Sequence, residues 1–355
     1  MSKNYCIFDA SIIMYRKMKK TLLITMLLLS LTVLFNACST DVDLYADYKD
    51  ITVVYGLLES GKDTNYVKIN KAFLGPGNAY NIALIADSCN YPTKLDAKII
   101  EYRAPANGNH YQESKTIVLD TITIHSKEPG IFYAPDQLVY YTTEKIRTNN
   151  DQYKYKYELQ IDRGDTILTA ETDIVGGEGF MVDSKPLGFK AEKGTVKWYP
   201  CPNAVVYELV INFYFTEIGP GNQSVDRCMT WSLGTHSSAS LTEDHGKYLL
   251  NYKSAVFYAN LASFLGNDTL KTDVERVISD YCLGVSVSAG GEELYNFISV
   301  NAPSSSIVQS IPEYTNINGG GYGVFSSRAA NEQIVKMSSI PDLLSHENWR
   351  FRQGK

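Results

Sequence analysis

Apolar and polar residues alternate in short runs from residue 51 onward, and Gly, Pro, Asn or Asp interrupts each run. The clearest run spans residues 154–161, whose apolar members are Tyr155, Tyr157, Leu159 and Ile161. A period of two predicts strands with one buried face and one solvated face. Many short strands separated by frequent turns predict a mainly β chain built from antiparallel β-sandwiches. Further strands of this half are expected at residues 51–58, 66–73, 97–103, 115–119 and 166–172.

A glycine-rich interruption at residues 176–179 separates this block of strands from a second one. In the second block, apolar residues alternate over residues 205–215, and they do so over the preceding strand as well. Helical spacing is found at residues 254–265, with Ser254 as the expected N-cap, and at 292–300, with acidic residues in the first turn. Residues 316–327 predict a glycine-rich turn that enters a final strand.

These breaks define the expected domain organisation. We expect a first β-sandwich domain at residues 51–175, a linker at 176–188, and a second β-sandwich domain at 189–330. Residues 331–355 are expected to be a C-terminal tail.

The first 50 residues predict an export signal. Lys19 and Lys20 precede an apolar run at residues 21–35, which is shorter than the roughly 20 residues that span a bilayer. The run is therefore expected to be the core of a signal peptide at residues 18–37. Residues 1–17 fit no signal-peptide pattern and are interpreted as an upstream or non-native extension.

The end of this apolar run carries a possible lipidation site. Residues 34–38, Leu-Phe-Asn-Ala-Cys, resemble the lipobox of bacterial lipoproteins. The resemblance implies that Cys38 becomes the acylated amino terminus, with palmitate or a similar chain. Each buried methylene contributes about 0.8 kcal/mol, so three acyl chains would hold the protein on a membrane. An ordinary cysteine after a plain secretory signal is the alternative.

Residues 38–50 are then a lipidated, acidic tether. Residues 39–43 resemble the acidic export tag that sends Bacteroidetes lipoproteins to the outer face of the outer membrane. A plain solvated tether fits the same residues.

The charge of the chain bears on its partners. The sequence has 33 basic and 39 acidic residues, a formal net charge of -6. Because the leader is basic, the exported part is more acidic than the whole. Phosphate backbones repel such a chain, so we expect no nucleic-acid partner.

The sequence has no linear motif typical of catalysis or cofactor binding. Residues 56–63 approach a phosphate-binding loop, but Asp63 stands where Ser or Thr must reach magnesium, so a hairpin turn is expected. Residues 319–323 lack the βαβ context of a dinucleotide loop and predict a turn with positive φ. The histidines, which lack metal-ligand spacing, are His110, His125, His236, His245 and His346. We expect residues 243–245 to form a solvated turn, and we expect no catalytic residue, no metal, no cofactor and no enzymatic activity.

Cysteines outside the leader and the lipidation site are Cys89, Cys201, Cys228 and Cys282. In an oxidising compartment four cysteines allow three pairings, and the spacing does not choose among them. Because three of the four fall in the second domain, we expect one disulfide there.

Residues 198–209 have the pattern Trp-x-Pro-x-Pro-x-Ala-x-x-Tyr-x-Leu. This pattern resembles the B and C strands of fibronectin type III and related immunoglobulin-like sandwiches. The resemblance implies that Trp198 and Tyr207 pack in the core and do not form a ligand platform.

Several patterns in order resemble one family. They are the lipobox, Tyr157-x-Leu159-x-Ile161 before Ala170-x-Thr172, the Trp198 pattern, Glu293-x-Tyr295-x-Phe297, and Asn316-Ile317 before residues 321–326. The family is a group of uncharacterised Bacteroidetes outer-membrane lipoproteins with two immunoglobulin-like domains, often encoded beside TonB-dependent transporters. The resemblance covers most of residues 38–330 and implies no established catalytic residues.

We therefore expect a non-catalytic lipoprotein on the cell surface that binds a ligand or partner, as an accessory of a TonB-dependent uptake system. A structural or adhesive, pilus-like component is the main alternative, and a hydrolase with a nonlinear site is a third. The loops expected to make contacts, if any do, are residues 236–245 and 319–323.

Overall fold

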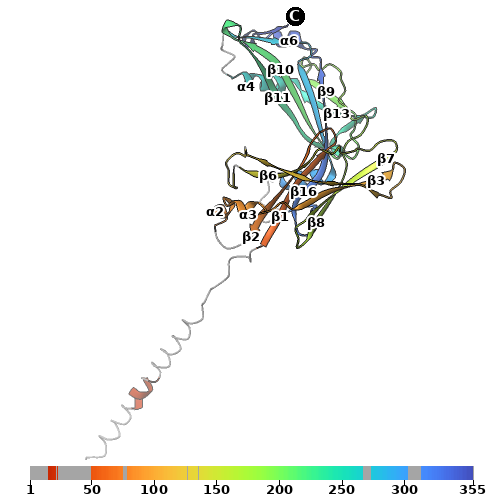
Figure 1. Ribbon diagram of the computed structural model, residues 1–355. Helices are drawn as coiled ribbons and strands as arrows, with labels where there is room; N and C mark the ends of the chain where they lie inside the picture. Colours follow the sequence, from red (N-terminus) through yellow and green to blue (C-terminus); the bar gives the residue numbers. More distant parts are fainter. Residues whose placement is uncertain are drawn as a thin grey trace, which may run out of the picture. The chain divides into compact units, whose positions relative to one another are not determined.

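The computed structural model describes residues 15–20, 22, 49–74, 78–125, 127–134, 136–266, 273–302 and 313–354 (Figure 1). The chain divides into two units, Met1–Asp47 and Tyr48–Lys355. In the first unit, residues 15–20 are helical. Cys38 and nearly all of the expected signal peptide and tether lie outside the described residues. None of the described helices has the length and apolar character needed to cross a membrane.

The second unit is mainly β and is built from several antiparallel sheets, which confirms the fold class expected from the alternation. Its strands are β1 (Lys49–Glu59), β2 (Asn65–Leu74), β3 (Asp96–Pro105), β4 (Gln112–Val118), β5 (Asp120–Ile124), β6 (Gln137–Thr142), β7 (Tyr153–Asp162), β8 (Ile167–Asp173), β9 (Lys193–Trp198), β10 (Val206–Ile218), β11 (Ser224–Ser237), β12 (Thr242–Asp244), β13 (Lys247–Lys253), β14 (Glu275–Ile278), β15 (Leu283–Gly290), β16 (Tyr322–Val335) and β17 (Phe351–Gln353). Its α-helices are α2 (Ala79–Ala83), α3 (Ala86–Cys89), α4 (Ser254–Leu265), α5 (Glu292–Asn301) and α6 (Ile340–Leu344). Short 3-10 helices are η1 (Pro220–Asn222), η2 (Ser238–Ser240) and η4 (Glu347–Trp349).

A first hydrophobic core lies between two sheets of the amino-terminal half. One sheet has the order β4-β3-β7-β8, and the other is the β16-β1-β2-β6-β5 part of a ten-stranded sheet. The four residues predicted to face inward on β7, Tyr155, Tyr157, Leu159 and Ile161, are at most 4% exposed. They share one cluster with residues of β1 and β2 such as Val54 and Ile69, so the alternation predicted the buried face of β7 correctly.

A second hydrophobic core lies in the carboxy-terminal half. Here the three-stranded sheet β12-β13-β9 and helix α4 enclose apolar residues of β10, β11 and β15. Trp198 and Tyr207 are 0% and 1% exposed, and their ring centroids lie 5.7 Å apart. Both residues therefore pack in the core, as the resemblance to fibronectin type III strands implied.

Strand β16 belongs to both halves. Its first residues pair in parallel with β1, from Val53 with Tyr322 to Glu59 with Arg328. From Arg328 onward it pairs antiparallel with β15 instead. The expected division into residues 51–175 and 189–330 therefore does not separate complete sheets. The sheet that contains β1 and β2 also contains β16, which begins at the end of residues 189–330. Alternation specifies which face of a strand is buried but not which distant strand lies beside it.

The parallel pairing of β16 and β1 requires a glycine. Gly323 has φ +112, and a Cβ at this position would lie 2.0 Å from the Val54 carbonyl oxygen. The turn before it has positive φ at Gly319 and Gly320, as expected from the sequence.

The expected linker and tail are packed parts of the second core. In the linker, Val182 and Leu187 are 3% and 7% exposed. Val182 forms an isolated β-bridge with Trp198, and Leu187 forms one with Met337. Strand β16 extends to Val335, and beyond it Leu343 and Phe351 join the same cluster. The sequence does not reveal these apolar residues, because each lies in a short segment or in an element of only three to five residues, too short for a periodic pattern.

Both predicted longer helices are present as α4 and α5. Ser254, however, does not cap α4. Lys253 occupies the cap position, and Ser254 Oγ donates a hydrogen bond to the Ala191 carbonyl at 2.5 Å. The acidic first turn of α5 is confirmed by Glu292 and Glu293.

The expected disulfide in the second domain is absent from the described residues. Cys89, Cys201, Cys228 and Cys282 are all free thiols. Cys228 is exposed on β11, whereas Cys201 and Cys282 lie in the second core. Because Cys228 faces solvent and the other two face inward, the sheet itself keeps Cys228 away from either partner.

Candidate functional site

An apolar pocket with a few polar groups lies on the sheet that contains β1 and β2, on the face that points away from the first hydrophobic core. Its volume is about 310 Å³. Strands β1 and β2 form its floor, and α3 and the connection between β5 and β6 form its walls. We call it the β1–β2 pocket. Cavities of roughly 300–1,000 Å³ with apolar walls and a few polar groups are typical of small-molecule sites.

The floor of the pocket follows from the alternation on two paired strands. On β1, Val54 is buried in the core while Val53 and Tyr55 point outward. On β2, Lys68 and Asn70 point outward in the same way. In the antiparallel register Tyr55 lies opposite Lys68 and Val53 opposite Asn70, so the four side chains form one patch.

Lys71 also borders the pocket, but its charge is used elsewhere. It lies next to Asn70 and Ala72 on β2, so its side chain points to the opposite face. There its amine pairs with Asp50 at 3.6 Å, and the Lys71 side chain is only 11% exposed.

The walls are fixed to the floor by hydrogen bonds. The Asn70 amide donates to the Cys89 carbonyl at 3.0 Å, which holds the end of α3 on β2. Tyr133 N donates to the Ala83 carbonyl at 2.8 Å, which joins the β5–β6 connection to α2. Lys127 Nζ donates to the Tyr133 carbonyl within the same connection. The pocket is thus an organised part of the fold.

Two lysine amines of the same charge line this pocket. Both Lys68 and Lys127 are half-buried and line it. Burial lowers the pKa of Lys68 from its ordinary value, and the nearby charge of Lys127 lowers it further. Within the described residues neither amine forms a salt bridge. The carboxylate of Asp136, also at the pocket, is held by His125 Nδ1 at 2.9 Å.

Asn70 adds a polar atom without a partner. Its Oδ1 is buried and has no hydrogen bond within the described part of the chain. Its Nδ2, in contrast, is engaged by Cys89. A buried acceptor without a partner costs about 1–3 kcal/mol, and a ligand that donates a hydrogen bond would recover this free energy.

Aromatic rings border the opening of the pocket. Tyr55 is 45% exposed and Phe132 is 59% exposed. Tyr55 is held in place by an edge-to-face contact with Phe297 of α5, with ring centroids 6.0 Å apart. Exposed rings on a fixed scaffold offer apolar contact area with little loss of side-chain entropy.

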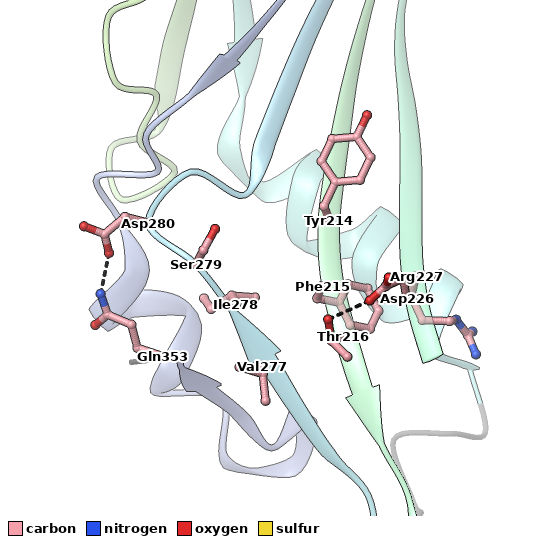
Figure 2. Close-up of a pocket in the computed structure, with 11 residues that line it drawn as sticks. Tyr214, Phe215, Thr216, Asp226, Arg227, Val277, Ile278, Ser279, Asp280 and Gln353 are labelled. Carbon is pink, nitrogen blue, oxygen red and sulfur yellow. Dashed lines mark hydrogen bonds between the residues drawn. The ribbon is translucent and has the colours of Figure 1, made fainter. Parts of the chain in front are cut away.

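A second, larger depression lies on the other half, where β10 changes its neighbour from β15 to β14. Its volume is about 690 Å³. Figure 2 shows two hydrogen-bonded pairs among its side chains: Thr216 Oγ1 donates to Asp226 at 2.8 Å, and Gln353 donates to Asp280. Asp280 also pairs with Lys336 at 2.7 Å. Arg227 pairs with Glu217 at 3.8 Å. Because Asp280 and Arg227 already have partners of opposite charge, the β1–β2 pocket is the better candidate for ligand binding.

The loops nominated from the sequence do not line the β1–β2 pocket. In the first, His236 bonds to the Leu233 carbonyl, and the exposed turn with His245 is held by Asp244. Asp244 in turn pairs with Lys197 at 2.7 Å. The expected turn at residues 243–245 is only partly correct, because Glu243 and Asp244 end strand β12 and the exposed turn itself is His245 and Gly246. Residues 319–323 form the turn into β16.

Other sequence expectations can be placed as well. Residues 56–63 are the end of β1 and its hairpin turn, where Lys62 N donates to the Glu59 carbonyl, as expected. No group of His, Cys, Asp or Glu side chains in the described residues is arranged to hold a metal ion. Cys38 lies outside the described residues.

Sequence reasoning missed Lys68 and Lys127. Lys68 had a local signal, because it alternates with the apolar, inward-facing Val67 and Ile69 and is therefore expected on the outer face of β2. Lys127 had none, since it lies in an irregular segment and reaches the pocket only through the tertiary fold. No protein-family model matches the sequence, and no curated protein matches it.

Proposed function

We propose that the chain is a non-catalytic, lipid-anchored protein of the outer membrane that is exposed on the cell surface and binds a ligand in the β1–β2 pocket. The observation that carries the proposal is the pocket itself, with its aromatic border, two amines without a carboxylate partner among the described residues, and the unpartnered Asn70 Oδ1. These features are those of a small-molecule site.

The anchor and the partner are proposed from the sequence. The lipobox-like residues 34–38 support acylation of Cys38, and the acidic residues that follow support export to the surface. The resemblance to lipoproteins encoded beside TonB-dependent transporters supports a role in uptake, in which the bound ligand is passed to such a transporter. Two immunoglobulin-like domains are part of the same proposal.

The anchor is tested by labelling with a palmitate analogue in a Bacteroidetes host. Wild type is expected to be labelled and Cys38→Ala is not, and protease shaving of whole cells is expected to digest the wild-type protein. Equal labelling of both proteins would refute the anchor. A mild-detergent pull-down from outer membranes is expected to recover a TonB-dependent transporter with the wild type.

The pocket is tested by filling it. Ala72 lines the pocket on β2, so Ala72→Trp is expected to occupy part of the 310 Å³ cavity. Ile167 on β8 is 59% exposed and lies outside it, which makes Ile167→Trp a matched control. Full-length protein in detergent is incubated with the small molecules of the growth medium, and retained compounds are quantified by mass spectrometry. Compounds retained by wild type and Ile167→Trp, but not by Ala72→Trp, support the proposal; identical retention by all three contradicts it.

One observation favours the structural alternative. Strand β11 has 14 residues and, within the described residues, pairs only with β10, so its other edge offers a long row of backbone groups. Such an edge is the usual acceptor for a strand from another subunit. Polymers of the purified protein that disappear when Thr230 is replaced by Pro would support an adhesive role.

A further inference from the structure

We infer that the β1–β2 pocket selects a small organic anion, whose negative group lies between Lys68 and Lys127 and whose apolar body lies against the aromatic border. This inference rests on the proposed function, because it names the class of ligand that the same pocket takes. A carboxylate and a phosphate monoester share the required chemistry.

The first argument is the charge inside the pocket. Lys68 lies on the floor and Lys127 on the wall, and the two like charges interact. Among the described residues the other charged groups at the pocket have partners. Asp136 Oδ1 lies 2.9 Å from His125 Nδ1, an exposed contact that becomes an ion pair when the imidazole is protonated, and Lys71 pairs with Asp50 on the other face of the sheet. An anion placed between the two amines would replace their repulsion with two attractions, each strengthened by the partial burial of the site.

The lowered pKa of Lys68 supports this argument. It shows that the ammonium form of Lys68 is disfavoured by burial and by Lys127 in the empty pocket. An anionic ligand opposes both effects, since it stabilises the charged amine.

The second argument is the apolar surface around the two amines. Inorganic anions need only polar partners, whereas this pocket presents Val53, Ala72 and Phe132 around its charged centre. Phe132 is 59% exposed, and covering it would remove apolar surface from water. The pocket therefore suits an anion that carries an aromatic or aliphatic body.

The test compares isosteric ligands that differ in charge. Naphthalene-2-carboxylate, 2-naphthyl phosphate and the neutral naphthalene-2-carboxamide are titrated calorimetrically into the full-length protein in detergent, with a detergent-only blank. The variants are Lys68→Met and Lys127→Met, which keep an unbranched apolar side chain but remove the charge. Lys98→Met is the matched control, because Lys98 is also a half-buried strand lysine but lies on β3, away from the pocket.

Wild type and Lys98→Met are expected to bind at least one of the two anions about tenfold or more tightly than the amide, the factor that a charge-assisted hydrogen bond supplies. Either lysine variant is expected to weaken anion binding by about tenfold while leaving amide binding unchanged. Preference for the carboxylate or for the phosphate then identifies the anionic group.

Two outcomes overturn the inference, and they differ in what they say about the proposed function. Equal affinity for the anions and the amide, with all binding lost in Ala72→Trp, would refute anion selection but retain the pocket as a binding site. Anion binding that persists unchanged in Ala72→Trp, Lys68→Met and Lys127→Met would refute both, because the probes would then bind elsewhere.

Discussion

Asn316 and Phe325 exchange two hydrogen bonds across nine residues of chain. The Asn316 amide donates to the Phe325 carbonyl at 2.7 Å, and its Oδ1 accepts from Phe325 N at 2.9 Å. One side chain thus satisfies both backbone groups of a strand residue that is 0% exposed. Its amide also donates to the Glu171 carbonyl at 3.2 Å, so it joins β16 to the end of β8.

We expect Asn316→Ala to lower the free energy of unfolding by about 2–3 kcal/mol, because it leaves the Phe325 backbone groups without partners. The measurement is denaturant unfolding of the full-length protein in detergent. The control is Asn318→Ala, since the hydrogen bonds of the exposed Asn318 to β8 within the described residues come from its backbone, and it is expected to change stability by less than about 0.5 kcal/mol. Equal effects of the two substitutions would show that the side-chain bonds of Asn316 are unimportant.

The second prediction concerns the crossing of β16 and β1. Gly323→Ala is expected to destabilise the protein by more than about 3 kcal/mol, because it combines an unfavourable φ with a clash against backbone. Gly320 has a similar positive φ of +84, but no atom lies within 4 Å of the position that a Cβ would take there. Gly320→Ala is therefore expected to cost only about 1 kcal/mol. The measurement is the melting temperature of the two variants: Gly320→Ala introduces backbone strain alone, and Gly323→Ala introduces strain and a steric clash. A similar decrease of the melting temperature in both would contradict the close approach of Gly323 to Val54.

The third prediction concerns the second core. Trp198→Ala is expected to cost about 3–5 kcal/mol, as a large-to-small change at a residue with 0% exposure. The indole Nε1 has no hydrogen-bond partner within the described residues. Trp198→Phe therefore loses volume but no hydrogen bond, and it is expected to cost clearly less. An unchanged melting curve for Trp198→Ala would rule out the packing described for β9.

The fourth prediction concerns pH. Glu293 Oε2 accepts hydrogen bonds from Thr172 at 3.1 Å and from Ser326 at 3.2 Å, and burial raises the pKa of this carboxyl above 4.5. Since the folded-state pKa is the higher one, the unfolded chain loses its proton first as the pH rises. Stability is then highest below about pH 4.5 for this group and falls as the pH rises through the folded pKa.

Glu293→Gln removes this titration, so its melting temperature relative to wild type is expected to be higher at pH 7 than at pH 4. Glu292→Gln, at the exposed neighbour, is expected to leave the pH profile of wild type unchanged. The measurement is the melting temperature of each protein between pH 4 and pH 8. Parallel profiles for wild type and Glu293→Gln would disprove the effect.

The fifth prediction concerns the thiols. Native protein treated with iodoacetamide is expected to be alkylated at Cys228, which is exposed, and to react at Cys89, Cys201 and Cys282 only after unfolding. Burial raises the pKa of Cys201 and of Cys282 to about 12, so both lack the reactive thiolate at neutral pH. Peptide mass spectrometry reads the result, and a cross-linked pair among these cysteines would contradict the free thiols.

The sequence predicted the local part of this fold well. The inward residues of β7, the core positions of Trp198 and Tyr207, and helices α4 and α5 all follow from periodicity or from a local pattern. The pairing of β16 with β1 does not, because no local property of Val53 distinguishes Tyr322 from any other strand residue as its neighbour.

The candidate site could not be predicted from the sequence either, because it also depends on contacts between residues that are distant in the chain. Lys68 and Lys127 lie on a strand and in a connection that are separate in the chain, and only the tertiary fold brings them to one pocket. The loops nominated instead were selected for histidines and glycines; in the structure His236 lies in β11, and His245 and the glycines at 319 and 320 form turns with positive φ. The cysteines were likewise misjudged: their number permitted a disulfide, but all four are free thiols, and Cys228 faces solvent while Cys201 and Cys282 lie in the second core.

The shared strand β16 also determines when the first half of the protein can be completed. Glu59 of β1 and its partner Arg328 of β16 are 269 residues apart in the chain. While the polypeptide is synthesised from its amino terminus, β1 has an unpaired edge until almost the whole chain has emerged. The energetic cost of closing so long a loop precedes the gain from pairing, which makes this step slow. A carrier that holds the nascent chain in an unfolded form would therefore be needed for longer by this protein than by one whose domains close in order.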